Sequence, residues 1–363
     1  GMVDAVAEAK FADKGVLLVS PAVGRRLFAD ELAHMDGREV EVVCGQGPWE
    51  ASEEGLGAIE RSQPGEGPLL GSATPTADGQ GGHSVVVDLD ATHLYLDAHR
   101  IDSTAIVPAA AAAEVMAEAA QACFPSLRVS EVTGCRLLKG IDRPDGGRRV
   151  RVELQPASDG DGGLEVQACV RQVDAPRRVH YRCVLRLRPK LDVPPRFEPS
   201  RVEGVSLSAR EAYAVLFHGP CLQVIARVDG LGPGGARAEV RASAPTEWMA
   251  APAAGARWVF DPGLLDAGPQ LAIVWARHVK DKTVLPVEFG RIVRFTDVMP
   301  AGLTMVFERL ATTTDDQVLA NVSYVDASGR LLMRVEGLRG IATAGLNRLA
   351  TDRARRPTAA GER

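Results

Sequence analysis

The chain has 363 residues, of which 45% are hydrophobic and 25% are charged, and its formal net charge is −5 at pH 7. This balance is typical of a globular protein and excludes a chain that is disordered throughout. A mildly acidic chain without a basic stretch is also a poor nucleic-acid binder, because phosphate contacts need clustered lysines and arginines.

Membrane and disulfide-rich classes are disfavoured as well. The longest apolar run, over 106–124, carries Glu114 and Glu118 and is otherwise mostly alanine, which is unsuited to spanning a bilayer. The six cysteines are scattered without Cys-x-x-Cys spacing, and no signal peptide is recognisable. This pattern predicts reduced thiols, no metal site and a cytoplasmic location.

Residues 1–50 have the pattern strand, helix, strand. Apolar runs at 16–19 and 40–44 flank a helix that begins with Ser-Pro. We expect these residues to form a small α/β fragment that is too short for a core of its own. Residues 51–82 are rich in Gly, Ser, Pro and Glu and are predicted to be a linker.

Residues 83–195 are predicted to form a β-rich unit around one helix. The helix is expected over about 108–123, where alanines recur at helical spacing. Strands are expected where polar and apolar residues alternate or apolar runs occur, at 84–87, 93–96, 129–138, 149–154, 164–170 and 179–187. The proline-rich stretch 189–199 then reads as a linker between two units.

Residues 196–345 repeat this pattern. A helix is expected over about 266–278, and strands at 222–228, 236–242, 288–295, 303–310, 318–325 and 331–335. The segment 130–141 after the first helix corresponds to 286–296 after the second. The sequence therefore predicts an α+β double hot-dog fold, in which two antiparallel sheets each wrap a central helix. The polar tail 346–363 is expected to fray.

A histidine stands just before the first predicted helix. His99 precedes a turn that contains Ser103, and Pro108 is positioned to start the helix. A neutral imidazole at this point is suited to act as a general base near neutral pH. The N–H groups of the turn and the positive end of the helix dipole are suited to bind an oxygen atom. The alternative is a histidine with a structural role only.

A carboxylate and an amide share one face of the second predicted helix. Asp266 and Gln270 are four residues apart, and Pro269 is tolerated only in a first helical turn, so we expect the helix to begin near Asp266. As an N-cap, Asp266 would have a lowered pKa. Burial beside Leu265 would instead raise the pKa, as a general acid requires. Both alternatives are open at the level of sequence.

A third pattern lies at 216–223, which reads Leu-Phe-His-Gly-Pro-Cys-Leu-Gln. Gly219 and Pro220 after His218 predict a rigid turn. Alone, this pattern indicates only a turn that opens a strand.

Together, these patterns resemble a polyketide synthase dehydratase domain over about residues 66–345. The resemblance rests on the order of the motifs Pro68-Leu-Leu-Gly71, Tyr95-Leu-Asp-Ala-His99, His99-x-x-x-Ser103-x-x-x-x-Pro108, His218-Gly-Pro-Cys-Leu-Gln223, Asp266-x-x-x-Gln270, Leu285-Pro286 and Arg291-Ile-Val-Arg-Phe295. The chain looks most similar to dehydratases of iterative bacterial synthases of the enediyne type, which implies a part in antibiotic biosynthesis. Residues 16–48 resemble the C-terminal end of a ketoreductase domain.

The resemblance implies that His99 is the general base and Asp266 the general acid in eliminating water from a 3-hydroxyacyl thioester, giving a 2-enoyl product. Gln270 would orient Asp266, and His218, where many relatives carry tyrosine, would contact the substrate hydroxyl or Asp266. The substrate would be held on the phosphopantetheine of an acyl carrier protein, without a metal or redox cofactor. The expected partners are this carrier protein, neighbouring synthase domains and a second copy in a homodimer, but neither nucleic acid nor a membrane.

The sequence departs from the family pattern at one position, and two other interpretations of the chain are open. The family carries glycine where this chain has Ser103, so the added Cβ bears on the approach of the backbone N–H to the thioester oxygen. A product-template or cyclase-like double hot-dog would use the same two residues for aldol closure, and a degenerate domain would serve as a non-catalytic dimer scaffold. The ketoreductase-like fragment favours dehydration, because a reductase supplies the hydroxyl group to be eliminated.

Overall fold

The computed structural model describes residues 25, 67–79, 81–158, 163–198 and 202–350. The chain divides into two units, 1–61 and 62–363, and every element below belongs to the second. The α/β fragment expected over residues 1–50 lies outside the described residues apart from Arg25, and the polar tail does so beyond residue 350. Within the described residues, no helix is both long and apolar enough to cross a membrane.

One antiparallel sheet of thirteen strands runs through the described part of this unit. Its strands are β1 (Thr76–Ala77), β2 (His83–Leu89), β5 (Arg128–Leu137), β7 (Arg148–Ser158), β8 (Leu164–Gln172), β9 (Val179–Arg188), β10 (Leu207–Ser208), β11 (Ile225–Gly232), β12 (Gly235–Arg241), β13 (Thr283–Arg294), β14 (Gly302–Arg309), β15 (Gln317–Val325) and β16 (Leu331–Thr343). They lie in the order β1-β2-β7-β8-β9-β5-β13-β16-β15-β14-β12-β11-β10. A small second sheet contains β3 (Arg100–Ile101), β4 (Thr104–Ile106) and β6 (Asp142–Arg143).

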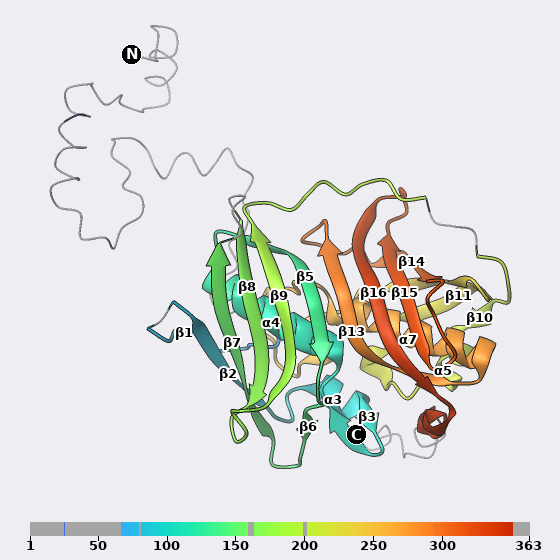
Figure 1. Ribbon diagram of the computed structural model, residues 1–363, viewed down its shortest axis with the longest axis horizontal. Helices are drawn as coiled ribbons and strands as arrows, with labels where there is room; N and C mark the ends of the chain where they lie inside the picture. Colours follow the sequence, from blue (N-terminus) through green and yellow to red (C-terminus); the bar gives the residue numbers. More distant parts are fainter. Residues whose placement is uncertain (1–24, 26–66, 80, 159–162, 199–201, 351–363) are drawn as a thin grey trace, which may run out of the picture. The chain divides into compact units, whose positions relative to one another are not determined.

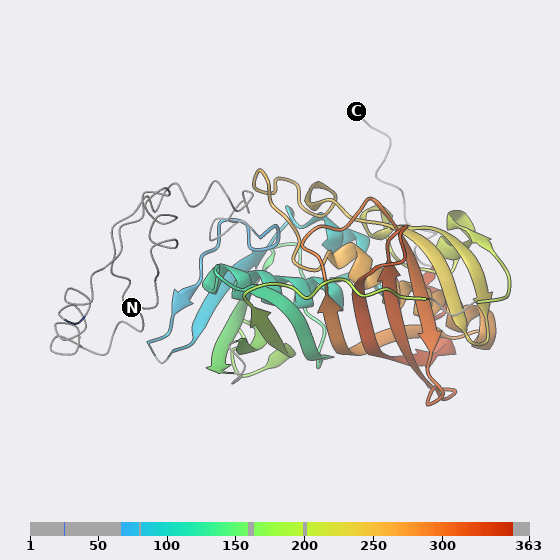
Figure 2. The ribbon, with the colours of Figure 1, turned by 90° about the horizontal axis from the view of Figure 1, so that it is seen from above.

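Two long helices lie against one face of the large sheet. The first, α4 (Ala109–Cys123), contacts β5, β7, β8 and β9, and the second, α7 (Pro262–Lys280), contacts β11 to β16 (Figures 1 and 2). Short helical segments complete the unit: α3 (Leu94–Ala98), α5 (Ala209–Ala214), η2 (Pro220–Leu222), α6 (Pro245–Trp248) and η3 (Ala344–Leu346). This arrangement confirms the predicted α+β double hot-dog fold.

The two halves are joined along one pair of strands. β5 follows α4 and β13 follows α7, as the predicted repeat requires, and these two strands pair with each other. Their facing residues Val132 and Ile292 are fully buried. Hydrogen bonds between β5 and β13 join the sheets of the two predicted units into one continuous sheet.

The alanine-rich helix α4 is buried on every side, which explains its composition. Small side chains allow the backbone to pack closely against the sheet and against α7. Two glutamates on α4 are buried as well. Glu118 Oε2 accepts hydrogen bonds from the N–H groups of Leu69 and Leu70 at 2.9 and 3.0 Å. Residues 67–79, which fall in the interval predicted as linker, thus include buried parts of the domain.

Two local expectations are corrected. Residues 93–96, expected as a strand, lie at and within the short helix α3, where Tyr95 and Leu96 are both buried. A short apolar run does not distinguish a strand from a helix, because either element can bury neighbouring apolar side chains when it faces the core. The strand expected from residue 222 begins at Ile225, because η2 occupies residues 220–222.

Candidate active site

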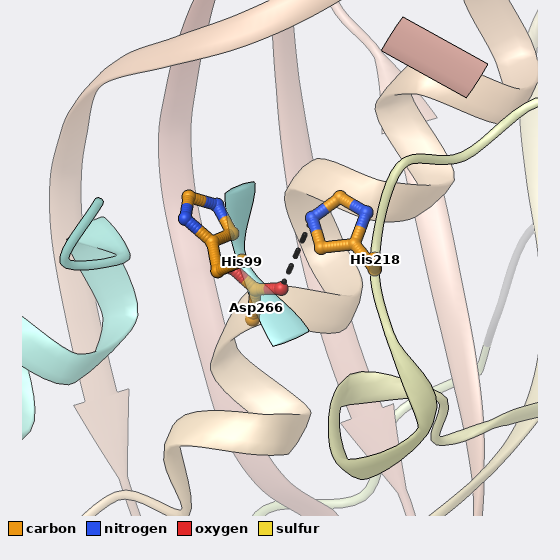
Figure 3. Close-up of side chains that lie close together, drawn as sticks. All are labelled: His99, His218 and Asp266. Carbon is orange, nitrogen blue, oxygen red and sulfur yellow. Dashed lines mark ion pairs between the residues drawn. The ribbon is translucent and has the colours of Figure 1, made fainter. Parts of the chain in front are cut away.

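Three polar side chains from separate parts of the sequence meet in the interior (Figure 3). His99 follows α3 in the first half, whereas His218 precedes η2 and Asp266 lies on α7 in the second half. One nitrogen of each histidine and one carboxylate oxygen lie within 4.8 Å of one another. The relative exposures of the three residues are only 8%, 2% and 4%. The structure therefore brings together three of the predicted site residues in a desolvated cluster.

The imidazole of His99 is held in one orientation. Its Nδ1 lies 2.8 Å from the carbonyl oxygen of Ile106, and Ile106 N–H donates to the His99 carbonyl at 3.0 Å. Since a carbonyl can only accept, Nδ1 carries the hydrogen and Nε2 keeps its lone pair. Burial lowers the pKa of His99, while Asp266 opposes this effect. A neutral imidazole with a basic Nε2 is the result.

Ser103 lies apart from this cluster, in the turn between β3 and β4. Its side chain is exposed, and its carbonyl accepts a hydrogen bond from the Arg100 guanidinium at 2.8 Å. The φ angle of Ser103 is +67°, in the left-handed region that favours glycine. The backbone thus adopts a conformation suited to glycine although serine occupies the position. Pro108 is the N-cap of α4, one residue before the helical residues begin.

The helix that carries Asp266 begins earlier than predicted. Asp261, not Asp266, is its N-cap: the Asp261 carboxylate accepts from Gly263 and Leu264 N–H at 3.0 and 3.1 Å. Pro269 consequently lies inside α7, where the rule that places proline in the first turn fails. The interpretation of Asp266 as an N-cap is wrong, and the full effect of a helix N-terminus falls on Asp261.

The buried position of Asp266 within α7 determines the direction of its pKa shift. Burial raises its pKa above the ordinary value, while His99 and the amide of Gln270 act in the opposite direction with smaller effects. A buried carboxyl with a raised pKa retains its proton to higher pH and is suited to donate it. A buried imidazole and a buried carboxyl with opposite pKa shifts therefore lie close together in the interior.

A chain of hydrogen bonds orients the Asp266 carboxyl. Gln270 Nε2 donates to Asp266 Oδ2 at 2.8 Å and to the Leu222 carbonyl at 2.9 Å. The Tyr213 hydroxyl donates to Gln270 Oε1 at 3.1 Å and accepts from Ile225 N–H at 2.9 Å. This arrangement fixes which end of the amide faces Asp266. Tyr213 belongs to none of the motifs found in the sequence, and no signal there indicates its role.

The turn at Gly219 and Pro220 brings the two histidines together. Gly219 N–H donates to the Ala98 carbonyl at 2.7 Å, and a Cβ at position 219 would lie 2.8 Å from Ala98 Cα. Only glycine permits this close approach. His218 is thereby placed beside His99, with ring centroids 5.5 Å apart.

The ring of His218 is also fixed within its own segment. It stacks on Phe217 with ring centroids 4.2 Å apart, and Gln223 Nε2 donates to the His218 carbonyl at 3.0 Å. Its Nε2 lies 3.5 Å from Asp266 Oδ2. Two imidazoles and a carboxylate are a donor set that transition metals accept. The same groups are sufficient for acid–base chemistry by themselves.

Comparison with known proteins identifies similar sequences and structures. One family model, described as polyketide synthase dehydratase domain, matches residues 67–169, and another, described as polyketide synthase dehydratase N-terminal domain, matches residues 191–348. No curated protein matches the sequence.

Solved structures share the fold at low sequence identity. The dehydratase domain from the CurF module of the curacin polyketide synthase is 20% identical with a TM-score of 0.60, and the match covers 78% of this chain and 100% of that one. A trans-AT polyketide synthase dehydratase domain from Brevibacillus brevis is 16% identical with a TM-score of 0.61, covering 73% and 95%. The dehydratase domain of a mycocerosic acid synthase-like synthase is 20% identical with a TM-score of 0.58, covering 76% and 95%.

Proposed function

The chain belongs to the polyketide synthase dehydratase family through residues 67–169 and 191–348, and we propose that His99 and Asp266 carry its reaction. Dehydratases of this family are hydro-lyases that act on 3-hydroxyacyl thioesters. The observation that carries the assignment of residues is the buried pair itself, in which a neutral imidazole lies close to a carboxyl with a raised pKa.

The elimination needs a base and an acid at the same time. His99 Nε2 removes the proton next to the thioester carbonyl, and the electrons of that C–H bond form the new double bond. The bond from C3 to the hydroxyl oxygen breaks, and Asp266 protonates the leaving oxygen so that it departs as water. Burial favours the required starting state of both groups, because it disfavours the charged form of each. Gln270 and Tyr213 hold the acid in place.

Two related structures support this choice of residue types. One is an inactive mutant of the CurK dehydratase in which phenylalanine replaces a histidine, and another is an inactive mutant of the same enzyme in which asparagine replaces an aspartate. A histidine and an aspartate are also the pair that meets in the cluster described above.

We propose in addition that the substrate is a 3-hydroxyacyl chain on the phosphopantetheine of an acyl carrier protein, delivered within a synthase that acts as a dimer. The synthase is iterative and of the enediyne type, and repeated cycles give a conjugated polyene. The motifs quoted above and the ketoreductase-like residues 16–48 support this finer assignment. The reaction uses no metal or redox cofactor, because proton transfer alone completes the elimination.

A reducing compartment is the expected location. The described cysteines, Cys123, Cys135, Cys169, Cys183 and Cys221, are free thiols. Thiols are retained where glutathione and thioredoxin keep proteins reduced. We therefore propose that the protein acts in the cytoplasm.

The test is the intact mass of a 3-hydroxyacyl carrier protein after incubation with the chain. The unaltered chain is expected to remove one water from the acyl group, whereas His99→Phe and Asp266→Asn leave the mass unchanged while circular dichroism shows a folded protein. His278→Phe, which alters an exposed histidine on α7, is the matched control and should retain activity. Substantial activity in either site variant would overturn its assigned role.

A further inference from the structure

His218 contacts the acid directly. Its Nε2 is paired with Asp266 Oδ2 (Figure 3), at a distance of 3.5 Å. The same oxygen accepts a hydrogen bond from Gln270 Nε2 at 2.8 Å. Both side chains are buried, with relative exposures of 2% and 5%. A second titratable group therefore stands beside the proposed proton donor, in a place from which water is excluded.

The position of His218 is built into the fold. Phe217 stacks on its ring, Gln223 binds its carbonyl, and the close approach of Gly219 to Ala98 anchors the next peptide. The contact with Asp266 thus depends on backbone and aromatic packing rather than on a freely rotating side chain.

We propose that His218 and Asp266 share the proton that is delivered to the leaving hydroxyl, so that the general acid is this pair rather than the carboxyl alone. This inference rests on the proposed function and deepens it. If His218 only positioned Asp266, any side chain that donates a hydrogen bond or fills the same space could replace it. Sharing the proton instead requires a side chain with a basic atom of its own.

Sharing the proton counters the interactions that stabilise the charged form of Asp266. Gln270 and His99 both favour the charged carboxylate of Asp266 and so work against its role as an acid. A proton that can reside on either of two groups is released at a higher pH than from either group alone, because the pair titrates as a unit. With one proton, the pair has no net charge in either arrangement, which suits a buried site.

The groups that surround the pair are compatible with this assignment. His99 at the end of α3 and Asp266 on α7 converge with His218. The side chains of Tyr213, Cys221 and Tyr324 also interact electrostatically with Asp266. Asp97 on α3 and Glu247 on α6 act electrostatically on the neighbouring Cys221 of η2. The Asp97 carboxylate is paired with Arg100 and Arg143, and the Glu247 carboxylate is paired with Arg241.

The step balances in atoms and charge. His99 Nε2 gains the proton from C2, the C3–O bond breaks with its electrons on oxygen, and the pair gives one proton to that oxygen to release water. The pair is then a neutral imidazole and a carboxylate, and His99 is an imidazolium. Return of the proton from His99 to the pair restores the starting state, and one ring nitrogen of His99 lies within 4.8 Å of an atom of each partner.

The test is the pH dependence of kcat/KM for a 3-hydroxyacyl carrier protein, compared among the unaltered chain, His218→Gln and His218→Phe. Glutamine keeps an N–H donor but holds no extra proton. We expect the alkaline limb of both variants to move down by about one pH unit, so that the loss at high pH is about tenfold greater than the loss near pH 6. Losses by the same factor at every pH, in variants folded by circular dichroism, would overturn the proposal.

A second measurement needs no substrate. In protein labelled at histidine carbons, the NMR signal of His218 is assigned by its absence in His218→Gln. Its titration midpoint is expected to be at least about one pH unit lower in Asp266→Asn, because asparagine neither attracts nor holds the proton. An unchanged midpoint would refute proton sharing. Absence of dehydration by the unaltered chain would refute the proposed function and leave this measurement intact, so the two failures are distinguishable.

Discussion

Single residues of the site owe their chemistry to where they are buried. The same physical cause lowers the pKa of His99 and raises that of Asp266, because burial disfavours an imidazolium and a carboxylate alike. The sequence alone does not reveal these pKa shifts, because they depend on burial in the folded chain. The hydroxyl of Tyr213 and the amide of Gln270 then fix the direction in which the acid points.

The first prediction at this scale concerns Tyr213→Phe. This change removes the acceptor for Ile225 N–H and the donor to Gln270 Oε1, so the free energy of unfolding should fall by about 1–3 kcal/mol. Because Gln270 Oε1 then loses its donor and the amide is held only through Nε2, kcat should fall by about tenfold. Tyr181→Phe, which deletes another buried hydroxyl that bonds the Val107 carbonyl, is the control. Equal kcat values in the two variants would show that Tyr213 has no positioning role.

The second prediction concerns Ser103→Gly. The φ angle of +67° disfavours serine, and relief of this strain slightly exceeds the added flexibility of glycine in the unfolded chain. The free energy of unfolding should therefore rise by about 0.5–1 kcal/mol in urea titrations, with dehydration activity retained. A large loss of activity would reveal a function of the serine hydroxyl.

Among the elements, α4 holds two other segments of the chain in place through its buried glutamates. Glu114 on this helix accepts from Val259 and Phe260 N–H at 2.6 and 2.8 Å, directly before the cap of α7. Glu118 holds the segment at Leu69 and Leu70 in the same way. A helix of one half thus positions the start of the helix that carries the acid in the other half.

This arrangement predicts a pH-dependent stability. Burial raises the pKa of Glu114 from its usual value of 4.5 to about 7, so the folded chain binds a proton that the unfolded chain releases between these values. The free energy of unfolding should consequently fall as the pH rises from about 4.5 to about 7, and Glu114 contributes at most about 1.4 kcal/mol per pH unit to this fall.

Urea unfolding at several pH values checks this prediction. Glu114→Gln should make the pH dependence of stability less steep, because the amide does not titrate, while buried Asp261 and Asp266 with raised pKa values keep part of it. Glu198→Gln, at an exposed position, should leave it unchanged. A slope in Glu114→Gln equal to that of the unaltered chain would show that Glu114 makes no contribution.

The elements also show how far sequence reasoning reaches. Alanine periodicity predicted α4, and alternation of polar and apolar residues predicted most strands, because both patterns reflect burial on one element. The start of α7 was missed, since the cap at Asp261 has an unusual φ of +55° and only its contacts reveal it. Pro269 then suggested a false helix start. Tyr213 was missed because its role depends on residues distant in the sequence.

For the whole molecule, the seam between β5 and β13 joins the halves and also assembles the site. His99 belongs to the first half and Asp266 to the second, so neither half contains both groups. The residue pattern predicted the two repeats but not their union, because edge-to-edge pairing depends on backbone hydrogen bonds that side-chain patterns do not specify.

The prediction at this scale is that the two halves unfold together. Ile292→Ala at the seam should lower the free energy of unfolding by about 2–5 kcal/mol, because it leaves a cavity opposite Val132. Far-UV circular dichroism, which reports both halves, and the fluorescence of Trp248, Trp258 and Trp275 in the second half should show one common transition. Ile341→Ala, at a residue 45% exposed, is the control with little expected effect. Two separate transitions would mean that the seam does not couple the halves.

The contact between Gly219 and Ala98 has an evolutionary consequence. It fixes the peptide after His218 through main-chain packing, so the side chain at 218 is free to change without rebuilding the turn. Histidine and tyrosine codons differ by a single nucleotide. One nucleotide change at codon 218 therefore suffices to exchange the titratable ring beside Asp266 for a neutral hydroxyl. Because Gly219 sets the path of the main chain, this exchange leaves the turn intact.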